Sequence, residues 1–154
     1  MQPKIVTLKE KKLVGIHSEM LVHQHEKILK LWRSFMPRKQ EVKNSLNHEL
    51  IALQDYISFG DFSKPYNIWA AVEVLDFLNV PIEMERFIIP EGTYAVFLHK
   101  GMNASLTYNK IMSEWLPNSG YIIDNRPHFQ IMGDKYLNGS PDSEEDFYIP
   151  IKSI

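Results

Sequence analysis

The chain of 154 residues contains no cysteine. This absence excludes a catalytic thiol, a disulfide framework and a cysteine-ligated zinc site. The sequence also has no glycine-rich phosphate loop and no motif that supports a Ser-His-Asp arrangement. His23 and His25 are two apart on an expected helix and so face different directions, which argues against a metal site. We therefore expect no catalytic residues, no metal and no cofactor.

Long apolar runs and a dominant charge are missing as well. No window approaches the ~20 apolar residues of a membrane-spanning helix, and the N-terminus lacks the apolar core of a signal peptide. The net charge is -2, and the lysines and arginines are scattered along the chain. We therefore expect a soluble, cytoplasmic protein that contacts no membrane and does not bind nucleic acid by itself.

The sequence does contain a pattern that recurs about 80 positions apart. Phe35–Pro37 aligns with Trp115–Pro117, and Tyr56 aligns with Tyr136. The hydrophobic content of 44% suffices for one compact domain with two halves. The recurrence predicts a single domain of residues 1–154 with two repeats, and these repeats cover the following ranges: about 5–77 and about 84–154.

Each repeat is expected to run strand, helix, strand, strand, because strand-like and helical apolar spacings alternate in that order. In the first repeat the expected elements are a strand at 12–17, a helix at 18–35 ended by Pro37, and strands at 49–57 and 67–76. In the second they are strands at 86–89 and 93–99, a helix that follows Asn103 and ends before Pro117, and strands at 128–134 and 147–151. The fold class is therefore expected to be α+β: two β-α-β-β repeats with pseudo-twofold symmetry, antiparallel sheets with helices on one face, and a cleft between the repeats.

Four segments carry a family resemblance: Gly92–Gly101, Trp115–Tyr121, Arg126–Gln130 and Asp142–Lys152. Together they resemble the gyrase-inhibitory-protein-like (GyrI-like) small-molecule-binding family, which also supplies effector-binding domains of AraC- and MerR-type transcription regulators. The resemblance implies an aromatic-lined ligand cleft between the two units. In members that bind cationic aromatic drugs it implies an acidic residue at the cleft bottom, where this chain has Gln130. An amide offers dipolar hydrogen bonds in place of a charge, so the implied preference for cations is in question.

Strand alternation indicates which side chains enter this cleft. Gln130 and Met132 share a face and are expected to point into the cleft, while their neighbours pack under the helix. The alternate apolar residues of the last strand are expected in the core, which leaves Tyr148 beside Gln130 as an aromatic wall. The same reasoning offers Phe97 to the cleft.

The first repeat is expected to contribute Tyr56, Trp69 and Glu73 to the ligand site. Glu73 would supply a charge, although an exposed salt bridge explains it at least as well. Trp115 lies on an apolar helical stripe, which is more typical of a core residue, and is kept as a further candidate. The acidic run Glu144–Asp146 is interpreted as a solvated entry to the last strand.

These observations predict a stand-alone binding protein for a small, flat, largely apolar aromatic ligand. The resemblance adds a link to transcriptional regulation or drug sensing, although the 154 residues contain no helix-turn-helix segment. Two alternatives remain open: a small-molecule hydrolase of the same fold, and a gyrase-inhibitor-like module that binds a protein partner.

Overall fold

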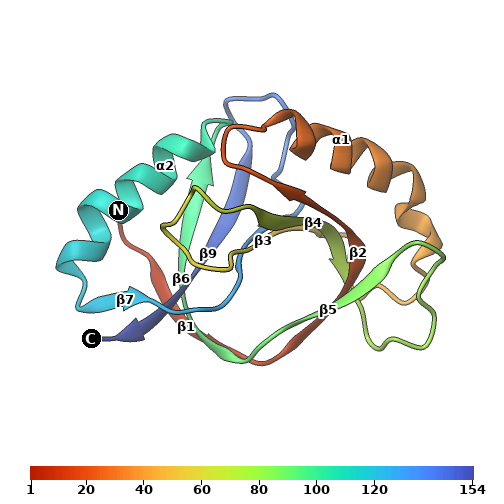
Figure 1. Cartoon of the computed structure of the whole chain (residues 1–154), viewed down its shortest axis with the longest axis horizontal. Coiled ribbons are helices and arrows are strands. Elements are labelled where there is room, and N and C mark those ends of the chain that lie inside the picture. The colour runs from red at the N-terminus through yellow and green to blue at the C-terminus, as the bar shows by residue number, and fades with distance from the viewer.

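A large curved antiparallel β-sheet forms the framework of the molecule, in a computed structural model that describes all 154 residues (Figure 1). Its strands, in chain order, are β1 (Lys4–Leu8), β2 (Lys11–Met20), β3 (Leu50–Asp55), β4 (Tyr66–Glu73), β5 (Glu85–Ile89), β6 (Gly92–Lys100), β7 (Tyr121–Ile123), β8 (His128–Met132) and β9 (Glu144–Ser153). The order across the sheet is β1-β6-β9-β8-β3-β4-β2-β5, and β7 pairs with β9. Strands β3 and β8 therefore lie at its centre.

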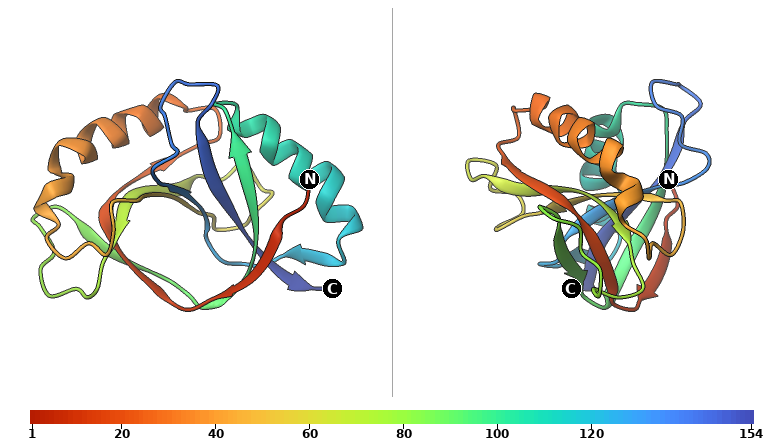
Figure 2. Two further views of the ribbon diagram at one scale, coloured as in Figure 1. Left: turned by 180° about the vertical axis from the view of Figure 1, so that it is seen from behind. Right: turned by 90° about the vertical axis from the view of Figure 1, so that its right-hand side faces the viewer.

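Two helices lie on the same side of this sheet (Figures 1 and 2). The first, α1, spans Glu26–Phe35 and continues as a 3-10 helix at Met36–Glu41. The second, α2, spans Ala104–Lys110 and continues as a π-helical turn at Ile111–Trp115 and a 3-10 helix at Leu116–Asn118. Both run beside the sheet without crossing its centre.

Each helix closes an apolar core against its own part of the sheet. Leu31 and Phe35 of α1 pack against β2 and β4, where they meet side chains such as Val14 and Ile68. Ile111, at the end of α2, is fully buried and belongs to a second core with apolar residues of β6 and β9. The two central strands, β3 and β8, lie between these two cores.

The opposite face of the sheet is buried too, because the sheet curls and its outer strands approach one another below it (Figure 1). A third core on this face contains Leu13, Leu53, Tyr94 and Phe129, all fully buried. Both faces of the central strands are therefore covered or partly covered, which allows no simple alternation of buried and exposed residues.

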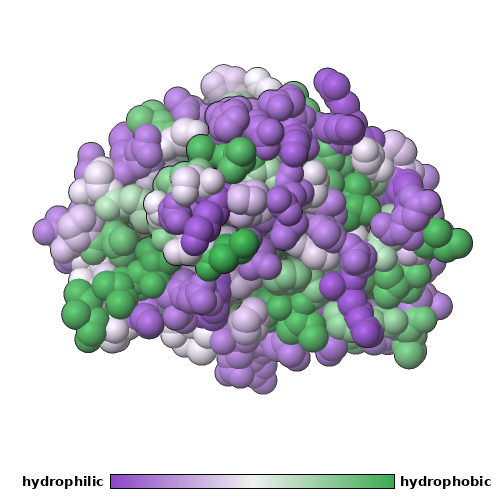
Figure 3. Space-filling view, viewed as in Figure 1, coloured by the Kyte–Doolittle hydropathy of each residue, from purple (hydrophilic) through white to green (hydrophobic).

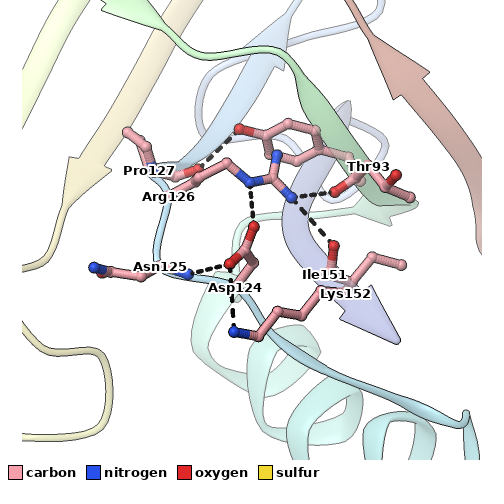
Figure 4. A network of polar contacts seen from close by, with 8 residues as sticks. Thr93, Asp124, Asn125, Arg126, Pro127, Ile151 and Lys152 are labelled. Atoms are coloured by element: carbon pink, nitrogen blue, oxygen red, sulfur yellow. Dashed lines mark hydrogen bonds and ion pairs between the residues drawn. The ribbon is translucent and has the colours of Figure 1, made fainter. Parts of the chain in front are cut away.

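An arginine clamp secures the chain just before β8 (Figure 4). The Nε of Arg126 donates to the Asp124 carboxylate at 2.7 Å, and its terminal nitrogen donates to the carbonyls of Thr93 and Ile151 at 2.6 and 3.1 Å. Its guanidinium also lies 4.6 Å from the centre of the Tyr94 ring. The clamp ties the entry of β8 to β6 and β9, and so fixes the strand that carries Gln130.

Most strands fall where the sequence predicts them, but the first helix begins later than expected. Residues 18–20 belong to β2, where Ser18 pairs with Ile68 and Met20 with Tyr66. Ser18 was expected to start the helix, but pairing with β4 overrides this local preference. Strands β1 and β7 were not among the predicted elements.

The sheets expected in the two halves are joined into one. Ala52 of β3 pairs directly with Gln130 of β8, and the neighbouring residues continue this antiparallel ladder. The structure is thus a mixed α/β fold with one large antiparallel sheet and two helices on the same side of it.

The outer surface mixes polar and apolar side chains. On the face seen in Figure 3, hydrophobic groups gather at the lower left and along the right-hand side, among many hydrophilic ones. Leu78 and Ile82, which follow β4 in the chain, are among the most exposed large apolar residues. Neither helix is long and apolar enough to cross a membrane.

Candidate functional site

A cleft of about 760 Å³ opens between α1 and α2, above the central strands. It is lined by 26 residues, of which 18 are hydrophobic. They come from the end of β2 and the region of α1, the region of α2, the strands β3, β4, β8 and β9, and the loop of residues 56–65 that joins β3 to β4. A largely apolar cleft of this volume with a few polar groups is typical of a small-molecule site.

The polar groups at the floor form a closed amide pair. Gln54 on β3 donates to the side-chain oxygen of Gln130 at 2.9 Å, and Gln130 donates back to Gln54 at 2.9 Å. The second N–H of Gln130 donates to the hydroxyl of Tyr108 on α2 at 3.0 Å. These contacts fix the orientation of the amides and of the tyrosine ring.

The Tyr108 hydroxyl remains a donor at ordinary pH. Burial raises its pKa well above the usual value of a tyrosine, so the group stays protonated. Because the oxygen accepts from Gln130, its own proton is left to donate to a ligand.

One acidic side chain lines the same cleft. Glu145 of β9 is half-buried in the wall. Burial, and to a smaller extent the neighbouring Asp146 carboxylate, raise the pKa of Glu145 to about 7. No lysine or arginine forms an ion pair with it. The cleft therefore contains an acid without a cationic partner in its wall, at Glu145, while its floor carries the amide of Gln130.

Aromatic rings close one end of the cleft. Tyr56 contacts Phe59 with ring centres 5.1 Å apart, Tyr66 at 4.6 Å and Phe62 at 6.5 Å. All four residues line the cleft. Trp32 of α1 belongs to the lining as well. Rings at this end provide flat apolar surface against which another ring can stack.

Three of the predicted site residues border this cleft. Tyr56 and Gln130 have their side chains in the network and aromatic end just described. Trp69 also borders it, but its ring lies on the opposite face of the sheet, stacked on His17 at 4.6 Å and packed on Phe87 at 5.2 Å. Only the first two therefore direct their side chains to the cleft.

Phe97, Trp115 and Met132 lie elsewhere. Phe97 and Trp115 pack edge to face, with ring centres 5.1 Å apart, in the core beneath the second helix. Met132 is buried at the end of β8, where it pairs with Leu50, and is not part of the cleft lining. The expected contribution of these three to the cleft wall is not what the structure shows.

The expected position of Tyr148 beside Gln130 is wrong. Gln130 pairs with Phe147, and Tyr148 pairs with Phe129, on which it stacks with ring centres 4.5 Å apart and planes inclined by 8°. The physical reason is that the core residues of β9 and the cleft share the helix side of the sheet, so the alternate residue faces away. Tyr148 belongs to the opposite core.

Glu73 also lies outside the cleft lining, because it forms an ion pair with Lys11 at 3.3 Å. The salt-bridge alternative considered for it is therefore the one that the structure contains. The charge in the cleft comes from Glu145, in the acidic run that was interpreted as solvated. Burial of the Glu145 carboxylate results from the pairing of β9 with β6, which cannot be predicted from the residues next to it in the sequence.

Comparison of the sequence with known protein families identifies the class of protein. Residues 4–151 of the chain match the family described as Cass2, integron-associated effector binding protein. The chain belongs to this effector-binding family, and the family resemblance predicted from the sequence is confirmed.

Two curated relatives extend beyond the matched region. The transcriptional regulator BrlR of Pseudomonas aeruginosa is 29% identical over 128 residues, which cover 79% of this chain and 45% of the regulator. A DNA gyrase inhibitor of Erwinia billingiae is 39% identical over 69 residues, 42% of each protein. The matched regions thus make up less than half the length of both relatives.

A solved structure shares the fold. SAV2435 bound to tetraphenylphosphonium superposes with a TM-score of 0.75 over 99% of this chain and 94% of that one, at 14% sequence identity. At this level of identity the similarity concerns the fold.

Proposed function

We propose that this protein binds a small, flat, aromatic cation in the cleft between α1 and α2. The observation that carries the proposal is the combination of an apolar, aromatic lining with one unpaired acid, Glu145, and an oriented hydroxyl, Tyr108. In this account the aromatic lining supplies most of the affinity, Glu145 selects the charge, and Tyr108 orients an acceptor group of the ligand.

Burial alone gives moderate affinity. A three-ring ligand that buries roughly 300 Å² of apolar surface gains about 7 kcal/mol at about 25 cal/mol per Å². Lost translational and rotational freedom offsets a large part of this gain. A charge-assisted contact with Glu145 therefore decides whether binding is weak or in the micromolar range.

The cationic ligand of SAV2435 supports a positive charge on the ligand of this protein. The cleft of this chain has no acid in the position of Gln130, but Glu145 on the adjacent strand β9 borders the same space. The proposal thus assigns to β9 the role that the family resemblance assigned to β8.

We also propose that ligand occupancy is read by a transcription regulator, as the match to BrlR supports. In this proposal residues 1–154 act as one effector-binding unit of two related halves, about 5–77 and 84–154. The order β2-α1-β3-β4 recurs as β6-α2-β8-β9 with the short β7 inserted before β8, and β3 pairs with its counterpart β8 at the centre of the sheet. A cleft shared by two halves is suited to transmitting ligand binding as a change in their relative position.

A matched pair of probes tests the charge preference. N-methylacridinium is a planar cation, and acridine at pH 8 is its neutral counterpart of nearly the same shape. Quenching of tryptophan fluorescence, with Trp32 in the cleft lining, should report binding of the cation at least tenfold tighter than that of acridine. Glu145→Gln should remove this preference.

Glu144→Gln is the control, because Glu144 precedes Glu145 on β9 and is not part of the lining. This variant should keep the preference for the cation. Equal binding of both probes to the wild type would refute the assigned role of Glu145. Absence of binding by either probe would count against small-molecule binding and favour a protein partner.

A further inference from the structure

His128 is a buried histidine that the proposed ligand contacts do not use. Its side chain is fully buried, and neither ring nitrogen has a hydrogen-bond partner. It begins β8, two residues before Gln130, and therefore shares the cleft side of the strand. Tyr56 and Tyr108 flank the imidazole, with ring centres 5.2 and 6.5 Å away, and both line the cleft. Yet His128 itself does not border the open space.

Phe59 is what covers it. The Phe59 ring stacks on the imidazole, with centres 4.5 Å apart and planes inclined by 23°. This is the arrangement that a planar aromatic ligand adopts on a flat ring. Phe59 lines the cleft on its other side, so its ring, together with those of Tyr56 and Tyr108, separates His128 from the open space.

The loop that carries Phe59 is weakly attached to the rest of the molecule. Among residues 57–64, only Phe59 is not exposed. The hydrogen bonds of this segment are internal: Asp61 to Ser58, and Ser63 and Lys64 to Asp61. Aromatic contacts therefore hold the loop in place, and it can move without breaking a strand pair.

Gly60, directly after Phe59, is a candidate hinge of the loop. Its φ is +98°, a backbone conformation that residues with a side chain rarely adopt, and nothing lies within 4 Å of the position that a Cβ would take. A change of the backbone angles at Gly60 therefore meets no neighbouring atoms at this position.

We propose that Phe59 occupies a ring-sized subsite over His128, and that a planar aromatic group of the ligand takes this subsite by displacing Phe59. The inference rests on the proposed ligand-binding function and adds to it the place of one ring. Displacement exchanges one stacked ring for another, so the imidazole stays covered throughout. The phenyl ring thus competes with the ligand, and its removal raises the apparent affinity by the reciprocal of the fraction of time that the subsite is free of Phe59.

The first test needs no ligand. Diethyl pyrocarbonate acylates accessible neutral imidazoles, and mass spectrometry of peptides follows each histidine separately. In Phe59→Ala, His128 should react at least tenfold faster than in the wild type. Ile57→Ala, an exposed residue of the same loop that does not line the cleft, should leave His128 protected. Unchanged protection of His128 in Phe59→Ala would overturn the proposal.

The second test uses N-methylacridinium. It should bind Phe59→Ala at least tenfold more tightly than the wild type, and it should protect His128 of this variant from acylation. Phe59→Leu, which fills the space without a stacking ring, should give intermediate affinity and shows whether truncation alone disturbs the loop. Weaker binding to Phe59→Ala, or binding without protection of His128, would mean that Phe59 is a wall of the site and would overturn the displacement.

The two tests separate this inference from the proposed function. If N-methylacridinium binds neither protein, small-molecule binding fails and the ligand subsite fails with it, while the acylation rates still show whether Phe59 covers His128. If the probe binds both the wild type and Phe59→Ala, and His128 of the variant stays reactive with the probe bound, small-molecule binding stands and only the subsite is refuted.

Discussion

Glu145 couples protonation to both folding and ligand binding. Its pKa in the folded protein, about 7, exceeds the ordinary value of 4.5, so the fold favours the protonated carboxyl. The stability that this preference contributes is present below pH 4.5 and is lost as the pH rises through 7. Above pH 7 the protein carries a partly buried, ionised carboxylate.

Glu145→Gln should therefore stabilise the free protein at pH 8 and have little effect at pH 4.5. The full shift corresponds to about 3 kcal/mol, and partial exposure of the carboxylate reduces the gain to about 1–2 kcal/mol. Urea unfolding at the two pH values measures the difference, with Glu144→Gln as the control. A variant that is less stable than the wild type at pH 8 would contradict the assigned burial of the charge.

His128 predicts the opposite pH dependence. Burial, with a smaller contribution from Arg126, lowers its pKa from 6.5 to about 3, so the fold requires the neutral imidazole. The associated stability is present above pH 6.5 and is lost as the pH falls toward 3. His128→Phe removes this titration and should gain about 3 kcal/mol over the wild type between pH 7 and pH 4.

The measurement is urea unfolding across this pH range, and the exposed His48 provides a matched control as His48→Phe. Parallel pH profiles of the wild type and His128→Phe would show that the imidazole is not held neutral by the fold.

At the scale of elements, Gly15 allows β2 and β4 to lie close together. A Cβ at this position would collide with the backbone carbonyl of Ala70 and with Ala71, which are held by the strand pairing. Because backbone atoms cannot move aside, Gly15→Ala should lower the free energy of unfolding by about 2–3 kcal/mol. Thermal unfolding measures this loss, and Ser18→Ala in the same strand should cost far less.

Which elements form was largely predictable from local pattern. The period-two spacing locates seven of the nine strands, and Pro37 locates the end of α1, because these signals depend on a few adjacent residues. The second helix was expected to run to Pro117, but α2 ends at Lys110 and continues as a π-helical turn. The start of α1 was not predictable in this way. Ser18 reads locally as a helix start, yet residues 18–20 extend β2 because β4 lies alongside, and the partner of Ser18 is Ile68, 50 positions away.

At the scale of the whole molecule, the position of the cleft depends on which face of the sheet the helices share. Alternation correctly separates Gln130 from Phe129, and Phe147 from Tyr148. Alternation alone does not predict that the helices and the cleft lie on the same face of the sheet. Nor does it predict that the curl of the sheet closes the opposite face. Tyr108 and Glu145 were therefore missed as cleft residues, since their meeting with Gln130 depends on the assembled sheet.

Ligand affinity should depend on pH, because Glu145, the acid in the cleft without a cationic partner, must be ionised to attract a cation. If N-methylacridinium binds only the ionised form of Glu145, a pKa near 7 makes binding about tenfold tighter at pH 8 than at pH 6. Calorimetric titration at both pH values measures this ratio. In Glu145→Gln the ratio should fall to about one, and an unchanged ratio would place the titrating group elsewhere.

The most direct measurement is a crystal structure of the protein with N-methylacridinium. The account predicts the planar cation between α1 and α2, with its charged ring near Glu145, the Tyr108 hydroxyl within reach, and Phe59 displaced from His128. A probe bound outside this cleft, or a cleft that remains empty at saturating probe concentration, would contradict the account.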